Sequence, residues 1–199
     1  DAHLVALDAR TGSLLWDVEV AKEESGYSKT AAPLVVGDKV ITGIAGGEFG
    51  IRGFIDAYEA KTGELAWRLY TVPGPGEPGN DTWAGDSWRT GGSATWMTGS
   101  YDPELNLVYW GTGPPAPLPE TLRGAGKADL LFTNSTLALD PDTGEMTWYF
   151  QHLPRDNWDL DHVFERMIVE TEVSPNPDDV PWISPDVRPG ERRKVITGI

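Results

Sequence analysis

The sequence predicts an all-β fold, a partial β-propeller of about three to four four-stranded blades. Three observations lead to this prediction: a hairpin motif that occurs three times, a tryptophan at the same place in each copy, and the absence of any long helical periodicity. A β-sandwich and a β-solenoid are the alternatives, but a tryptophan that closes every hairpin is better explained by radial blades. We expect residues 1–199 to form one partial propeller domain, truncated at both ends.

The repeated hairpin motif occupies residues 6–16, 57–67 and 138–148. Each copy contains an apolar strand, an acidic residue followed three positions later by Thr-Gly, and a second strand that ends in tryptophan. The acidic residue can cap backbone amides and the glycine can adopt a positive φ, as tight turns require. We therefore expect Trp16, Trp67 and Trp148 to be mostly buried, between blades or against the hairpins of neighbours. The longer spacing before the third copy predicts an insertion or an extra-long blade.

Further strands are expected between the hairpins. The candidates are residues 33–41, 94–99 and 107–111, which are separated by clusters of Gly, Pro, Asp and Asn. Because no segment shows sustained helical spacing, these strands are the elements available to complete the blades.

Composition limits the classes of partner and chemistry. The chain has 31 acidic and 16 basic residues and a formal net charge of -15, which argues against nucleic acid or an anionic lipid surface and favours cationic partners or metal ions. The lack of cysteine excludes disulfides, thiolate metal sites, a cysteine nucleophile and a c-type haem attachment motif within this segment. No apolar run is long enough for a transmembrane segment, and the first residues do not form a signal peptide.

The first candidate site motif lies outside the repeats and combines Gly46, Gly47 and Glu48, downstream of Thr30. A glycine pair removes side chains where a planar ligand must come close, and a carboxylate directly after it offers hard oxygen ligands to a hard cation. Taken alone, Gly-Gly-Glu is more often an ordinary turn with a solvated glutamate. The residues on either side of this motif favour a ligand-binding site over an ordinary turn.

Trp96 is a second candidate, because it follows a Gly-Gly pair and falls outside the repeat register. Its indole can form a flat apolar floor for a planar cofactor, although another inter-blade tryptophan is the simpler alternative. The third candidate is the pair Asp159 and Asp161. In an extended backbone these two carboxylates face the same side, so both could bind one ion. A pair of surface aspartates is the corresponding alternative.

Together these motifs resemble the pyrroloquinoline quinone (PQQ)-dependent alcohol dehydrogenases of the methanol/ethanol dehydrogenase family. The resemblance extends over nearly the whole chain and implies an internal piece of an eight-bladed quinoprotein propeller with the quinone on its axis. It implies that the cofactor-binding residues are Thr30, Ala45, Gly46, Gly47 and Trp96. Ala45 stands where some relatives have serine, so one polar contact is missing.

The resemblance also implies the metal ligands Glu48, Asp159 and Asp161, with Asp159 as the catalytic base that takes the alcohol proton. Asp161 matches an additional aspartate of the lanthanide-dependent branch, and an extra negative charge favours a trivalent over a divalent cation. The bound ion is therefore expected to be calcium or a lanthanide. One departure is Pro114, because the family usually has a metal-binding asparagine there. The metal site could therefore be retuned or lost.

The function implied by this resemblance is oxidation of a small primary alcohol with PQQ, followed by electron transfer to a cytochrome c or a quinone. Relatives work in the periplasm, so the same location is expected. The alternative from another class is a non-catalytic propeller that serves as a protein-binding scaffold. A glycosidase is a weaker candidate, because Asp159 and Asp161 are too close in sequence to flank a substrate.

Overall fold

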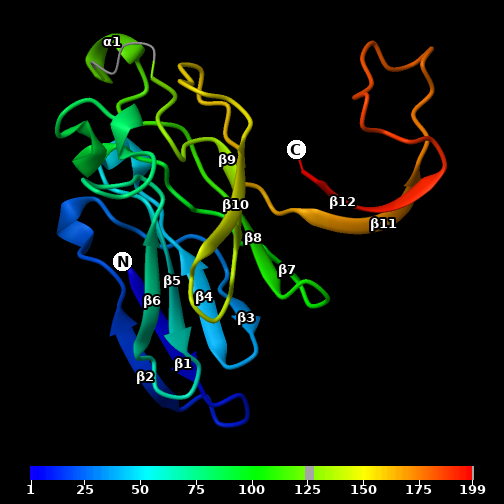
Figure 1. Cartoon of the computed structure of the whole chain (residues 1–199). Coiled ribbons are helices and arrows are strands. Elements are labelled where there is room, and N and C mark those ends of the chain that lie inside the picture. Colours follow the sequence, from blue (N-terminus) through cyan, green and yellow to red (C-terminus); the bar gives the residue numbers. More distant parts are fainter. Residues whose placement is uncertain (124–127, 199) are drawn as a thin grey trace.

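The computed structural model describes residues 1–123 and 128–198, and the described chain consists almost entirely of antiparallel β-strands (Figure 1). Two sheets have four strands, in the orders β3-β4-β5-β6 and β10-β9-β8-β7, and two sheets are two-stranded hairpins, β1-β2 and β11-β12. We call the four-stranded sheets blade I and blade II, in chain order. The partial propeller predicted from the sequence is confirmed, with two complete blades and a hairpin on either side in sequence.

The strands have the following bounds: β1 His3–Leu7, β2 Leu14–Glu19, β3 Leu34–Val36, β4 Lys39–Gly43, β5 Phe54–Glu59, β6 Leu65–Tyr70, β7 Ser100–Asp102, β8 Leu107–Gly111, β9 Ser135–Leu139, β10 Met146–Gln151, β11 Met167–Val173 and β12 Glu191–Thr197. The helical elements are a single short helix, α1 Glu120–Arg123, and four 3-10 turns within the part described. No helix of the described residues is long and apolar enough to cross a membrane.

The three repeat copies form hairpins β1-β2, β5-β6 and β9-β10, as predicted. Asp8 shows how the turn is built: its carboxylate accepts the backbone amides of Arg10 and Thr11 at 3.0 and 2.8 Å. Gly12 then adopts a φ of 71°, which brings the chain into the returning strand. The acidic residue and the Thr-Gly pair therefore account for the tight turn.

The repeat tryptophan of one hairpin docks on the next hairpin. The indole Nε1 of Trp16 donates to the carbonyl of Ala60 at 3.0 Å, and Trp67 donates to the carbonyl of Pro141 at 2.9 Å. Each indole also covers the turn glycine of the hairpin that it contacts; a Cβ on Gly63 would lie 2.8 Å from the Trp16 ring. Successive hairpins are thus joined by equivalent contacts.

Trp148 differs from the other two repeat tryptophans, and the prediction that it is mostly buried is wrong. Its residue is 39% exposed, and its ring contacts Tyr109 at a centroid distance of 5.7 Å. The reason is that no further copy of the repeat occurs in residues 149–199 to receive its indole. Trp16 is half-buried and Trp67 is buried.

The core lies between the sheets. One cluster joins blade I to blade II and consists of the buried side chains Val36, Ile41, Ile55, Ala57, Trp67, Val108, Trp110, Phe132, Leu137 and Leu139. A second contact joins the first hairpin to blade I, where Arg68 binds the fully buried Asp56 at 2.7 and 2.6 Å and donates to the Val20 carbonyl at 3.0 Å. Apolar packing therefore joins the two blades, and the Arg68 side chain, which is oriented by Asp56 within blade I, joins the first hairpin through the Val20 carbonyl.

Two of the strand predictions need correction. Residues 33–41 contain a strand and the start of another, β3 and β4, because Gly37 adopts a φ of 60° and turns the chain between them. Residues 94–99 form no strand; they cross the end of the blades within the long connection from β6 to β7. This connection and the one from β8 to β9 account for the longer spacing before the third repeat.

Candidate functional site

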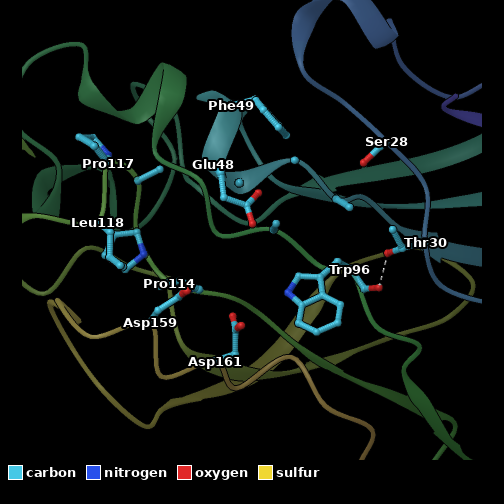
Figure 2. A pocket seen from close by; sticks show the side chains of 16 residues that line it. Ser28, Thr30, Glu48, Phe49, Trp96, Pro114, Pro117, Leu118, Asp159 and Asp161 are labelled. Atoms are coloured by element: carbon cyan, nitrogen blue, oxygen red, sulfur yellow. Dashed lines mark hydrogen bonds between the residues drawn. The ribbon is translucent and has the colours of Figure 1, made fainter.

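A pocket of about 600 Å³ lies where the non-repeating segments meet (Figure 2). This volume is in the range of small-molecule binding sites. Its lining comprises Ser28, Thr30, Ala45, Gly46, Gly47, Glu48, Phe49, Ala94, Trp96, Pro114, Pro115, Ala116, Pro117, Leu118, Asp159 and Asp161. Every cofactor, metal and catalytic residue predicted from the sequence is in this set. The structure therefore brings together residues that are distant in sequence, while their individual roles stay predictions.

The turn after β4 gives the pocket its close backbone. Gly46 has a φ of 115°, and a Cβ at this position would overlap the carbonyl oxygen of Gly26. Ala45 is paired with Ser28 through two backbone hydrogen bonds of 2.9 and 3.1 Å. The chain then forms a short 3-10 turn, Gly47–Phe49, which exposes Glu48 toward the cavity (Figure 2). Only glycine fits at Gly46, because both the φ angle and the available space exclude a side chain.

Trp96 forms one side of the pocket and is fixed through the backbone on both sides of it. The Thr95 hydroxyl donates to the Phe54 carbonyl at 2.6 Å and accepts the Ile44 amide at 2.9 Å. The Thr30 hydroxyl donates to the Trp96 carbonyl at 2.9 Å, as Figure 2 shows. The half-buried indole is thus held beside the carboxylates, and Thr30 contributes to its placement.

The loop after β10 carries Asp159 and Asp161, and it is not extended as the sequence argument assumed. Asp159 has a φ of 62°, a left-handed conformation that is uncommon for residues with a side chain. Both carboxylates nevertheless line the pocket, and in Figure 2 Asp161 points toward Glu48 from the opposite side. The shared orientation comes from a turn, because the left-handed residue redirects the chain between the two aspartates.

Asp161 is a partly buried carboxylate with one unpaired oxygen. Its Oδ1 atom is buried and has no hydrogen-bond partner among the described residues, and a Cβ on Gly113 would lie 3.1 Å from it. Burial, followed by the negative charges of Asp159, Asp156 and Glu48, raises the pKa of Asp161 to about 6, against the opposing effect of the Trp96 side chain. A cation between these carboxylates would satisfy the unpaired oxygen and relieve the repulsion.

The carboxylates of Glu48, Asp159 and Asp161 line one pocket but do not surround a single point. In residues 1–123 and 128–198, no group of three His, Asp or Glu side chains is close enough to hold a metal ion. The donor set of Glu48, Asp159 and Asp161 is chemically suited to a hard cation, because it offers only oxygen ligands. The pocket therefore offers the oxygen ligands of a hard-cation site, while the three carboxylates are not all within reach of one ion in this arrangement.

Pro114 lines the same pocket but offers no side-chain oxygen. Its carbonyl accepts the Ser93 amide at 3.0 Å and is thus engaged within the protein. Of the groups that could replace an amide ligand here, Asp161 is the one with a free buried oxygen.

Sequence reasoning missed part of the pocket wall. The residues that it missed are Ser28, Phe49, Ala94 and the segment 115–118. Ser28 carried a usable signal, because it lies two positions before Thr30 and so faces the same side of an extended segment. The segment 115–118 carried none, since its position depends on the long connection between β8 and β9.

The chain was compared with known protein families and relatives. The family described as "Glucose/ethanol/alcohol dehydrogenase, beta-propeller domain" matches residues 1–180. Among curated relatives, the quinoprotein alcohol dehydrogenase PedH of Pseudomonas putida is 47% identical over 182 residues, which is 83% of this chain and 30% of PedH. The lanthanide-dependent methanol dehydrogenase of Methylacidiphilum fumariolicum is 38% identical and is matched over 87% of this chain and 31% of its own length.

Solved structures agree with the sequence comparison. The quinohemoprotein alcohol dehydrogenase ADHIIG of Pseudomonas putida HK5 superposes with a TM-score of 0.86 at 38% identity, over 98% of this chain and 28% of that one. A europium-containing methanol dehydrogenase gives a TM-score of 0.81, over 87% of this chain and 33% of its own. This chain spans about a third or less of the relatives it matches. It belongs to the β-propeller domain family of the glucose, ethanol and alcohol dehydrogenases.

Proposed function

We propose that this chain is part of a PQQ-dependent dehydrogenase that oxidises a small primary alcohol, and that its pocket holds part of the quinone and metal site. The observation that carries the proposal is the meeting of Glu48, Asp159 and Asp161 with Trp96 around one cavity of about 600 Å³. Family membership supports it, because the matched relatives are quinoprotein alcohol dehydrogenases. Residues 1–199 would then be one partial propeller domain of a longer protein.

In this proposal Trp96, Gly46 and Gly47 would hold the quinone, since all three line the pocket. Ala45 and Thr30 complete this side of the site. When bound, PQQ accepts two electrons, and the metal ion acts as a Lewis acid. The chain itself supplies a flat apolar surface and a backbone without side chains at the point of closest approach.

Asp159 is the residue that we propose to take the hydroxyl proton of the alcohol. Its carboxylate is exposed at the pocket, so a substrate hydroxyl can reach it without displacing protein atoms. Glu48 and Asp161 would hold the ion, with Asp159 as a third oxygen donor. Three carboxylates around a trivalent ion approach neutrality, whereas around a divalent ion they leave a net negative charge, so we propose a preference for a lanthanide over calcium.

The electron acceptor and the location follow from the same proposal. Some of the matched relatives are named for cytochrome c, as in the methanol dehydrogenase subunit of Methylorubrum extorquens. We propose a cytochrome c or a quinone as acceptor and the periplasm as the location. The net charge of -15 supports a basic cytochrome, since opposite charges accelerate encounter.

The test uses the full-length protein that contains this chain, loaded with PQQ and either calcium or lanthanum, in a dye-linked alcohol oxidation assay. We expect alcohol oxidation with lanthanum, and a loss of about 100-fold or more in kcat for Asp159→Asn. Asp161→Ala should lower lanthanum-supported turnover far more than calcium-supported turnover. No PQQ-dependent oxidation with either ion, or equal metal responses of Asp161→Ala and the parent, would overturn the respective parts of the proposal.

A further inference from the structure

Asp156 is a fully buried residue of the loop after β10, three positions before Asp159, and it does not line the pocket. Its Oδ1 accepts the Trp158 amide at 2.8 Å, and its Oδ2 accepts the Leu160 amide at 2.7 Å. These two amides lie on either side of Asp159. The carboxylate thus holds the chain in the turn that gives Asp159 its left-handed φ of 62°.

Asp156 is in turn anchored to blade II. Its Oδ2 also accepts the side-chain amide of Asn134 at 3.1 Å, and Asn134 directly precedes β9. The backbone amide of Asn134 donates to the Gly113 carbonyl at 2.9 Å. Gly113 is the residue that lies against Asp161. One buried network therefore fixes the aspartate loop relative to the blade.

Arg123 joins the same loop to the part of the pocket wall formed by Pro117 and Leu118. The residue is 5% exposed, and its guanidinium donates to the carbonyl of Asp156 at 2.9 Å and to Asn157 Oδ1 at 3.2 Å. It also donates to the carbonyls of Pro117, at 3.1 Å, and Leu118, which line the pocket. The Arg123 side chain therefore links the aspartate loop to the pocket residues Pro117 and Leu118.

We propose that Asp156 and Arg123 are positioning residues, which hold the Asp159 and Asp161 carboxylates toward Glu48 before the metal ion binds. The inference rests on the proposed metal site and deepens it, because neither residue lines the pocket and neither can be an ion ligand in this arrangement. Groups that orient metal ligands from behind are worth about 10- to 100-fold in metal affinity. Asp156 and Arg123 are placed to act in this way.

The test measures metal binding to the full-length protein without any turnover. Terbium is titrated and followed by tryptophan-sensitised luminescence, and the signal of the site is the part that Glu48→Gln abolishes. Asp156→Asn keeps the shape of the side chain but replaces one acceptor oxygen with a donor, so we expect terbium affinity to fall about 10-fold or more. Europium luminescence lifetimes in H2O and D2O should show more coordinated water in this variant, because Asp159 no longer reaches the ion.

Asp102→Asn is the matched control. Asp102 is also buried and accepts two backbone amides, those of Glu104 and Leu105 at 2.9 and 3.3 Å, together with the Lys194 ammonium at 2.8 Å. It does not line the pocket. This variant should lose stability and one negative charge but keep the terbium affinity and europium hydration of the parent.

Arg123→Lys separates geometry from charge, because it keeps the positive charge and shortens the reach of the donors. We expect Arg123→Lys to weaken terbium binding, as Asp156→Asn does, and to raise the hydration of europium. If Asp156→Asn does not fold, Arg123→Lys serves as the test. Unchanged affinity and hydration in these variants would overturn the inference. If the parent protein itself binds no terbium at Glu48, the proposed function fails instead.

Discussion

The blades and the pocket of this protein are built by different rules. In the blades, the same hairpin recurs, and each repeat tryptophan donates to an equivalent carbonyl of the next hairpin, Trp16 to Ala60 and Trp67 to Pro141. In the pocket, no segment repeats, and the backbone turns at left-handed residues such as Gly46 and Asp159. The blades are therefore held by packing between regular elements, and the pocket by individual hydrogen bonds.

This difference explains where the chemistry lies. Regular strands present alternating side chains to the neighbouring sheets, so their inward positions are occupied by the core. The connections at the end of the blades do not have to fill the core, so they can carry the oxygen ligands and the glycines that a cofactor needs. The blades thus form a rigid support for the irregular loops, and these loops form the pocket.

The largest effect is expected for the inter-blade contact. Trp67→Ala removes a buried indole and its hydrogen bond to Pro141, so it should lower the free energy of unfolding by about 4 kcal/mol. Trp158→Ala, in the aspartate loop, removes a side chain whose residue is 73% exposed and should cost less than about 1 kcal/mol. Urea unfolding of the full-length variants measures both, and equal losses would contradict the contrast between blade and loop.

An intermediate effect is expected within the pocket, at two neighbouring glycines. Gly46→Ala forces a side chain onto the Gly26 carbonyl at a φ of 115°, and it should cost about 3 kcal/mol of unfolding free energy. In Gly47→Ala the new Cβ meets Ala94 Cβ at 3.5 Å, an ordinary contact, so the protein should lose at most about 1 kcal/mol. Similar stability of the two variants would show that the tight turn at Gly46 is not required.

The same contrast decides how much could be predicted from sequence. The hairpins could be predicted, because the acidic residue, the Thr-Gly pair and the tryptophan are local signals repeated three times. The exposure of Trp148 could not be predicted, because it depends on whether another hairpin packs against this side chain. The predicted site residues came from family resemblance, and all of them line the pocket. The turn at Asp159 was missed, because Asp156, which accepts amides two and four residues ahead, occurs in a loop that is not repeated and carries no Thr-Gly pair to mark the turn.

The last expected effect depends on pH and concerns a lysine at the boundary of the two regions. Lys29 lies between the pocket residues Ser28 and Thr30, but its ammonium turns inward and donates to the Gly43 carbonyl at 2.9 Å. Burial lowers the pKa of Lys29 to about 8, despite the opposing effect of Asp56. The charged form therefore costs stability, and this cost is fully present below pH 8.

Below pH 8 both states bind this proton, and the unfolded chain binds it more tightly. As the pH rises from about 8 to 10.5, the ordinary pKa of lysine, this difference in proton binding stops favouring the unfolded state. Over that range the unfolding free energy of the parent should rise relative to that of Lys29→Met, in which the group does not titrate. Urea unfolding of both proteins at several pH values provides the comparison. A constant difference between them would mean that Lys29 is solvated in the native protein.

The most direct test of the central claim is a crystal structure of the full-length protein with PQQ and europium, using anomalous diffraction to locate the ion. The account predicts one strong anomalous peak bound by Glu48, Asp159 and Asp161, with the planar quinone against the Trp96 indole. Oxygen ligands should lie about 2.3 to 2.6 Å from the ion, as for other large hard cations. A pocket that contains neither group, or an ion bound elsewhere while these carboxylates point apart, would contradict the account.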